Sequence, residues 1–212
     1  MMNDELSAYE KFQQRYEEER IPWDDTLPPP EIIDLTINLK PGRALDLGCG
    51  YGRAAIYLAR QGWSVEAIDF IPQAIERAKN YAAEAGVSDQ IDFHVASAAD
   101  LDFLNPPFDL AIDIGCMHSF SEEMLKSYRT ELVRLLESGA IYTLFAHLRR
   151  EESDPGEDPR GINEEDIYSL LAPYFELQRV EYGLTQVEDK PPWPSGWFWF
   201  RRASKTSPHE LG

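Results

Sequence analysis

The stretch Ala44–Arg53, ALDLGCGYGR, decides the fold of this chain. Its first residues are typical of a buried strand, and the three alternating glycines allow a tight turn and a close approach to a ligand, because no Cβ stands in the way. A helix over 54–60 follows, and its first N–H groups have no partner within the helix and would point at that ligand. Asp46 lies just before the turn, where its carboxylate can receive an ammonium group. The stretch therefore predicts a strand, a glycine turn and a helix that bind a small ligand.

The glycine spacing separates two kinds of nucleotide-binding turn. A nicotinamide-dinucleotide motif reads G-x-G-x-x-G, and its third glycine would fall at Arg53. The register here is acidic-x-Gly-x-Gly-x-Gly instead. An NAD(P)-dependent oxidoreductase is therefore only the second choice among enzymes for this motif. A glycine-rich connection without a chemical role is the interpretation that involves no enzyme.

Composition limits the class of protein and its partners. A length of 212 residues is typical of one domain with a sizeable core. The net charge of −18, from 20 Lys+Arg against 38 Asp+Glu, repels phosphate backbones and argues against nucleic acid as a partner. We expect no membrane partner, because no apolar run has the length of a membrane span. Two cysteines and the lack of a signal-peptide pattern predict a cytoplasmic protein with reduced thiols.

Strands and helices alternate along most of the chain. Predicted strands cover 44–47, 63–69, 91–95 and 141–146, and the stretch 108–118 is a further strand that runs into a loop. Predicted helices cover 31–39, 54–60, 72–85, 122–137 and 164–171, and an antiparallel strand pair covers 175–182 and 196–202. This alternation predicts an α/β fold with a parallel sheet, whose ligands bind at the carboxyl ends of the strands.

The two ends of the chain differ from this core. We divide the sequence into an N-terminal helix and arm over 1–30, a main domain over 31–202 and a tail over 203–212 that we expect to be disordered. Trp23 in the arm is equally compatible with a lid over a flat cofactor and with an anchor for the arm. The charged segment 147–161 is compatible with a substrate lid or with a solvated loop.

Candidate site residues follow each parallel strand. They are Asp46, Gly48 and Gly50 after the first strand, Asp69 at the end of the second, Ser97 and Ala98 after the third, Gly115 and His118 after the fourth, and His147 after the fifth. Asp69 is 21 positions past Gly48, where an acidic residue meets the ribose hydroxyls of a bound nucleotide in doubly wound sheets. Asp69 can equally cap the helix that begins near Pro72. We expect these residues to share one edge of the sheet.

With these residues, the chain from about residue 9 to 202 resembles the class I S-adenosylmethionine (SAM) methyltransferases. It more narrowly resembles the small-molecule branch with thiopurine S-methyltransferase and tellurite-resistance methyltransferases, on the segments 22–24, 52–59, 67–70 and 113–118. The resemblance implies a Rossmann-like, doubly wound, seven-stranded sheet in the order 3-2-1-4-5-7-6, with strand 7 antiparallel and helices on both faces.

The resemblance also implies a reaction. A methyl group would pass from SAM to a sulfur, oxygen or nitrogen of a small molecule by in-line displacement, which leaves S-adenosylhomocysteine. A SAM-binding sensor or scaffold without turnover is the alternative. The complete glycine turn together with Asp69 favours the enzyme, which would be a monomer or a homodimer and would need no metal.

The cofactor-binding residues implied by the resemblance are Trp23, Asp46, Gly48, Cys49, Gly50, Arg53, Asp69, Phe70, Ser97, Ala98 and Gly115. Phe70 would stack on adenine, Trp23 and Arg53 would close over the methionine end, and the carbonyl of Gly115 would receive the ammonium group. Residues 96–98, Ala-Ser-Ala, stand where the family commonly has Gly-Asp-Ala. Either adenine is held more weakly, or Asp100 supplies the missing acid.

Catalysis asks little of such a protein, because the methyl group of SAM is already activated. A thiol acceptor needs no base, whereas a hydroxyl or amine acceptor benefits from one. His118 and His147 are the candidate catalytic residues, because imidazole titrates near neutral pH. For each of them a purely structural role is equally open.

Overall fold

The computed structural model describes residues 13–14, 27–149, 161–186 and 192–204. Trp23, most of the N-terminal arm, the greater part of the segment 147–161 and the tail from residue 205 lie outside the described residues. None of the helices in the described ranges is long and apolar enough to cross a membrane.

One seven-stranded sheet organises the chain, in the order β3-β2-β1-β4-β5-β7-β6. The strands are β1 (Arg43–Leu47), β2 (Ser64–Asp69), β3 (Ile91–Val95), β4 (Phe108–Ile114), β5 (Leu136–His147), β6 (Phe175–Thr185) and β7 (Trp193–Arg202). Strand β7 runs antiparallel to both β5 and β6, whereas β1, β2 and β3 pair in parallel, as do β4 and β5. The predicted fold class and strand order are confirmed. The chain divides into two compact units, residues 1–98 and 99–212.

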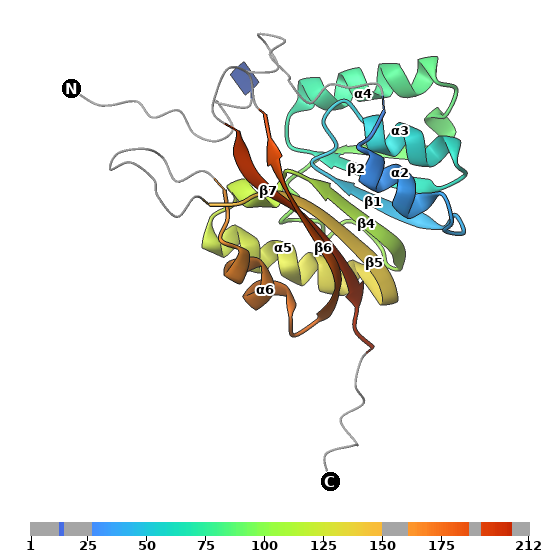
Figure 1. Cartoon of the computed structure of the whole chain (residues 1–212). Helices are drawn as coiled ribbons and strands as arrows, with labels where there is room; N and C mark the ends of the chain where they lie inside the picture. Colours follow the sequence, from blue (N-terminus) through green and yellow to red (C-terminus); the bar gives the residue numbers. More distant parts are fainter. Residues whose placement is uncertain (1–12, 15–26, 150–160, 187–191, 205–212) are drawn as a thin grey trace, which may run out of the picture. The chain divides into compact units, whose positions relative to one another are not determined.

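The first unit contains β1, β2 and β3 with the helices α2 (Pro30–Thr36), α3 (Arg53–Arg60) and α4 (Pro72–Glu84), and the short 3-10 helix η1 (Ser88–Gln90). Buried alanines on one side of α3 and α4 allow the helices to pack closely on the strands. A proline at its first position starts α4, where its missing N–H costs nothing. Figure 1 shows α3 and α4 on this unit's strands.

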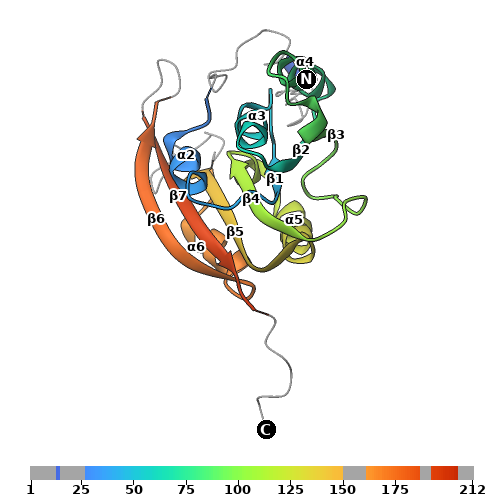
Figure 2. The same ribbon diagram turned by 90° about the vertical axis from the view of Figure 1, so that its right-hand side faces the viewer.

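The second unit contains β4 to β7 with α5 (Glu122–Leu135), α6 (Glu164–Leu171) and the 3-10 helix η2 (Met117–Ser119). The Ser121 hydroxyl caps α5 by accepting the Met124 N–H at 3.3 Å. Aromatic rings from both helices meet the sheet, since Tyr128 lies against Tyr142, and Tyr168 against Phe198. Figure 2 shows the long, twisted strands β6 and β7 of this unit.

Several predicted boundaries were wrong by three or more residues or by a change of element. Helix α5 ends at Leu135 and β5 begins at once, although the helix was expected to reach 137 and the strand to begin at 141. Leu136 is already extended because it pairs with Phe108, and the register then shifts before Leu110. Strand β7 begins at Trp193, not at 196, because β6 extends to Thr185 and pairs with Trp193 and Pro194. Helix α2 ends at Thr36, three residues before the predicted end.

Candidate active site

The glycine turn after β1 has the backbone that only glycine adopts easily. Gly48, Gly50 and Gly52 have φ values of 72°, 55° and 80°. A Cβ on Gly52 would also lie 3.2 Å from Cε1 of Phe93. The turn closes on itself, since the N–H of Gly52 donates to the carbonyl of Cys49 at 2.9 Å. Larger residues at these places would therefore distort the turn.

Hydrogen bonds tie this turn to the end of β2. The N–H groups of Gly48 and Cys49 both donate to the carbonyl of Ile68 at 2.8 Å. The N–H of Gly50 donates to Oδ2 of Asp69 at 2.9 Å. These three N–H groups are thus engaged within the protein, unlike those of a turn that cradles a phosphate.

Asp46 places a negative charge at the start of α3. Its Oδ2 accepts the N–H of Ala55 at 3.1 Å, and the side chain is buried. A carboxylate already satisfies the helix N-terminus here, so an anionic pyrophosphate would be repelled and a cationic group attracted. This electrostatic arrangement disfavours the NAD(P) interpretation.

Asp69 does not cap α4, whose N-cap is Ile71, but it binds the backbone on both sides of the β2 end and keeps capacity for a ligand. Its two oxygens accept the N–H groups of Gly50 and Ile71, each at 2.9 Å. Burial raises the pKa of Asp69, whereas the N–H groups of Ile71, Gly50 and Phe70 lower it. Each carboxylate oxygen has a second lone pair, so bonds to ribose hydroxyls remain chemically possible. The carbonyl of Asp69 accepts the N–H of Ala96 at 3.0 Å, which brings the exit of β3 beside it.

The other predicted cofactor residues of this unit follow the ends of β1, β2 and β3. Cys49 and Ala98 are buried, and Arg53, Phe70 and Ser97 are half-buried. Asp100, which belongs to the second unit, is exposed. Phe70 packs against the cluster of Tyr51, Ile71 and Ala74.

Sequence reasoning missed a cation–π contact and a hydrogen bond of Arg77 beside the turn. The guanidinium of Arg77 lies 4.8 Å from the ring centre of Tyr51, and its Nε donates to the Tyr81 hydroxyl at 2.9 Å. The spacing of Arg77 and Tyr81 by four residues on a predicted helix was the available signal. The contact with Tyr51 could not be found from spacing, because it joins the turn to α4.

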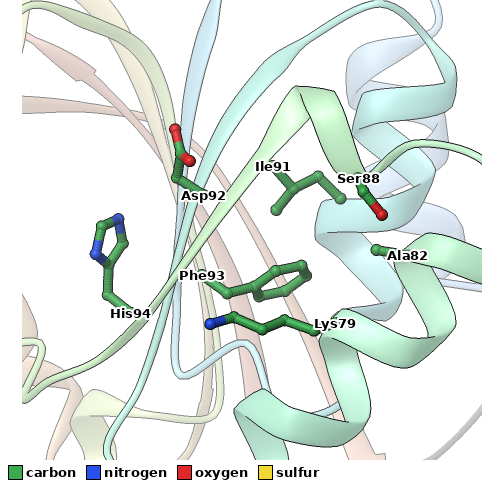
Figure 3. A pocket seen from close by; sticks show the side chains of 7 residues that line it. All are labelled: Lys79, Ala82, Ser88, Ile91, Asp92, Phe93 and His94. Atoms are coloured by element: carbon green, nitrogen blue, oxygen red, sulfur yellow. The ribbon is translucent and has the colours of Figure 1, made fainter.

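A shallow cavity of about 370 Å³ lies between α4 and β3. Figure 3 shows Ile91 and Phe93 pointing toward α4, and Asp92 and His94 pointing to the other side of the strand. None of the predicted site residues lines this cavity. We therefore assign it no part in the reaction.

In the second unit, the residues after β4 and β5 come together. Gly115 has a φ of 89°, and its N–H donates to the carbonyl of Phe145 at 3.0 Å. The rings of His118 and His147 stack with centres 4.9 Å apart and planes at 25°. Nδ1 of His118 accepts the backbone N–H of His147 at 3.5 Å, a long contact that favours the tautomer with the proton on Nε2.

Both histidines are neutral at pH 7. Burial, and to a smaller extent the neighbouring His147, lower the pKa of His118 to about 3. Burial also lowers the pKa of His147. A neutral imidazole can take a proton from an acceptor, so the pair has the protonation state that a general base needs.

Asp113 organises the loop that carries His118, and sequence reasoning assigned it no role of its own. Its buried carboxylate accepts the N–H groups of Cys116 at 2.7 Å and Met117 at 3.1 Å, and the Tyr128 hydroxyl at 2.7 Å. Burial raises the pKa of Asp113 to about 6, against these hydrogen bonds. An acid inside an otherwise apolar strand was the available signal.

The described ranges contain no group of three or more His, Cys, Asp or Glu side chains that could hold a metal ion.

The predicted site residues form two clusters, one in each unit. The first joins the ends of β1, β2 and β3 around Asp46 and Asp69, and the second joins Gly115, His118 and His147.

Comparison with known proteins identifies the family. Residues 44–139 match the family described as a methyltransferase domain. A 2-heptyl-1-hydroxyquinolin-4(1H)-one methyltransferase of Mycobacteroides abscessus is 30% identical over 162 residues, which cover 76% of this chain and 71% of that protein. The chain belongs to the SAM-dependent methyltransferases.

Solved structures show the same fold. A structure described under the conversion of a disulfide bond into a thioacetal group during echinomycin biosynthesis superposes with a TM-score of 0.76 and 27% identity, and the match covers 93% of this chain and 94% of that one. The 1,6-didemethyltoxoflavin-N1-methyltransferase of Burkholderia thailandensis, solved with S-adenosylhomocysteine, gives a TM-score of 0.71 and 23% identity over 92% of this methyltransferase and 86% of that chain.

The family confirms the enzyme class and the cofactor that the resemblance implied. The protein is a SAM-dependent methyltransferase of the small-molecule type, and its cofactor is SAM. The roles assigned to single residues, and the acceptor atom, stay predictions.

Proposed function

We propose that this methyltransferase transfers the methyl group of SAM to a nucleophilic oxygen, nitrogen or sulfur of a small molecule by in-line displacement. The observation that carries the proposal is the glycine turn joined to two buried carboxylates, Asp46 of β1, which accepts an N–H from α3, and Asp69 at the end of β2. The named activity of the Mycobacteroides abscessus relative supports a small organic acceptor.

The residues of the first unit fit the cofactor. When bound, SAM supplies a methyl group activated by its positive sulfonium. Asp69 would accept from the ribose hydroxyls, Phe70 would stack on adenine, and Gly48 and Gly50 would allow the methionine and ribose portions to approach the backbone. Asp46 fixes the turn and supplies negative charge beside it. Arg53 and Trp23 would cover the methionine end.

The residues of the second unit would act on the acceptor and the ammonium group. The carbonyl of Gly115 would receive the ammonium group. His118 and His147 are neutral and adjacent, and one of them would take the acceptor's proton where the acceptor is a hydroxyl or an amine. A thiol acceptor, which ionises near neutral pH, would not need them.

Isothermal titration of the whole chain with SAM, S-adenosylhomocysteine and NADH tests the cofactor assignment. We expect the two adenosyl ligands to bind and NADH not to bind. Asp69→Ala should weaken SAM binding by about 1–3 kcal/mol, the usual range for a hydrogen bond to a charged group. Asp69→Asn, which keeps one acceptor oxygen, should lose less.

The matched control is Asp89→Ala, because Asp89 is an exposed acid of the same unit. Its SAM affinity should equal that of the unchanged protein. Circular dichroism must show that the Asp69 variants remain folded, because Gly50 and Ile71 lose their acceptor. Equal SAM affinity in folded Asp69→Ala would remove Asp69 from the cofactor site.

A further inference from the structure

Aromatic side chains line one face of β5 and β7 in the second unit. Phe145 pairs with Trp197 across the antiparallel strands, with ring centres 5.1 Å apart. His147 lies 5.5 Å from Phe145 and 6.2 Å from Trp193 by ring centres. We call Phe145, His147, Trp193, Trp197 and Trp199 the aromatic row.

The row lies on the face of β5 and β7 opposite to the one that packs on α6. Alternate residues of the same strands point to that other face, where Tyr142 stacks on Phe200 and Phe198 meets Tyr168 of α6. Trp197 and Trp199 of the row are themselves buried in the hydrophobic core, whereas the other three members of the row are half-buried.

The row is closed at one end and open at the other. Trp197 and Trp199 are only 8% and 7% exposed, whereas Phe145, His147 and Trp193 are half-buried. The open end coincides with the carboxyl end of β5. Nε1 of Trp193 donates to the carbonyl of Leu148 at 2.9 Å, which fixes the orientation of the indole. An oriented, partly exposed aromatic surface favours a flat apolar ligand.

Among the residues that the structure describes, the charged groups shown in contact with the row, Arg179 and its partner Glu181, lie at its closed end. The guanidinium of Arg179 lies 4.6 Å from the ring centre of Trp199 and pairs with Glu181. The open end contains rings and a neutral imidazole, so it suits an uncharged acceptor better than an oxyanion.

The two histidines are not equivalent toward a ligand. Nδ1 of His118 accepts the backbone N–H of His147. Within the described residues, the ring nitrogens of His147 make no hydrogen bond, and its ring contacts those of His118, Phe145 and Trp193. His147 therefore has a nitrogen free to meet an acceptor placed on the row.

We propose that Phe145 and Trp193 bind a planar aromatic acceptor that carries an O–H or N–H group, and that the adjacent His147 takes the proton of that group. The inference rests on the proposed methyl transfer. As the acceptor's oxygen or nitrogen forms its bond to the methyl carbon, the carbon–sulfur bond breaks, its electron pair stays on sulfur, and the acceptor's proton passes to His147. His118 is a positioning residue that stacks on His147.

Binding of matched probes in the presence of S-adenosylhomocysteine tests the subsite. 2-Naphthol and 4-hydroxyquinoline should bind, and saturated decahydro-2-naphthol should bind at least tenfold more weakly. Trp193→Leu should weaken 2-naphthol binding at least tenfold. Tyr182→Leu, which removes an exposed aromatic ring from the opposite face, should leave it unchanged.

Methyl transfer to the two planar probes tests the base. His147→Gln should bind 2-naphthol within about threefold of the unchanged protein, yet lower kcat at pH 7 by about 100-fold or more, the usual contribution of a general base. Its rate should recover as pH rises toward the acceptor's own pKa, because an ionised acceptor needs no base. His118→Gln should keep the shape of the pH profile.

Several results would overturn the inference. Three concern binding: equal binding of 2-naphthol and its saturated counterpart, no effect of Trp193→Leu on 2-naphthol binding, or tetramethylammonium competing for the row more strongly than 2-naphthol. Two concern the reaction: no methylation of either planar probe, or a pH profile that changes in His118→Gln alone. Titration with SAM separates the two proposals. Absence of SAM binding contradicts the proposed function, whereas SAM binding with any of these results contradicts only the acceptor subsite.

Discussion

His118 and His147 stack on each other, yet their surroundings give them different properties. His118 accepts a backbone N–H and has its pKa lowered to about 3 by burial. His147 ends β5 and reaches the aromatic row. We therefore propose that His118 positions its neighbour, whereas His147 takes the proton.

The lowered pKa of His118 predicts a pH dependence of stability. The unfolded chain protonates this histidine near pH 6.5, whereas the folded protein does not until about pH 3. Stability is thus complete above pH 6.5 and is lost as pH falls. Between pH 7 and pH 5, we expect the free energy of unfolding to fall by about 2 kcal/mol more in the unchanged protein than in His118→Gln.

Urea titrations of both proteins at several pH values measure this difference. Other titrating groups are common to the two proteins and cancel. Tyr182→Leu should follow the unchanged protein. Parallel pH curves for the unchanged protein and His118→Gln would show that the folded protein does protonate His118 in this range.

Among the elements, the loop between β4 and α5 depends most on buried polar contacts. Asp113 at the end of β4 accepts two N–H groups of this loop and the Tyr128 hydroxyl of α5. Tyr128 in turn shares a hydrogen bond of 2.9 Å with Tyr142 of β5. One carboxylate therefore joins two strands, a loop and a helix, and it sets the backbone that presents Gly115 and His118.

Tyr128→Phe tests this network. At pH 7.5 the Asp113 carboxylate is ionised, and losing its Tyr128 donor should lower the free energy of unfolding by about 1.5–3 kcal/mol. Burial raises the pKa of Asp113 to about 6, so the ionised form opposes folding and stability is lost as pH rises through this range. Without Tyr128 that pKa rises further. The cost of the substitution should therefore be smaller at pH 5.

Chemical denaturation at the two pH values gives the comparison. Tyr168→Phe in α6 is the control, because its hydroxyl bonds to Glu164 and not to Asp113. The decrease in the free energy of unfolding caused by Tyr168→Phe should be similar at both pH values. A Tyr128→Phe cost that is larger at pH 5 would contradict an ionised Asp113 at neutral pH.

For the molecule as a whole, the net charge of −18 is the dominant feature. Repulsion among like charges opposes the compact state, and salt screens it. The same field repels polyanions, which is consistent with an enzyme for small molecules.

Raising NaCl from 0.02 to 0.3 M should therefore raise the unfolding temperature by about 2–4 °C, which corresponds to about 1 kcal/mol for a chain of this size. Differential scanning calorimetry measures the shift. Choline chloride at the same ionic strength should act equally, because the effect depends on screening. A lower unfolding temperature in both salts would mean that attractive ion pairs outweigh the repulsion.

The sequence by itself determined the features that local pattern encodes. The glycines at alternate positions predicted a tight turn after the first strand, and the structure shows that turn with left-handed backbone at all three glycines. The positions of Asp46, Asp69, His118 and His147 at strand ends followed from the alternation of strands and helices. The methyltransferase family followed from the register of these residues.

Only the tertiary structure decided how the groups of these residues are used. The N–H groups of Gly48 and Gly50 are bound by β2, which spacing in the sequence cannot reveal. The carboxylate of Asp113 meets Tyr128 because α5 packs on the sheet. The aromatic row depends on the antiparallel register of β5 and β7, in which a shift by one residue would move every ring to the other face. Contacts between distant segments arise from packing, and packing is a property of the whole fold.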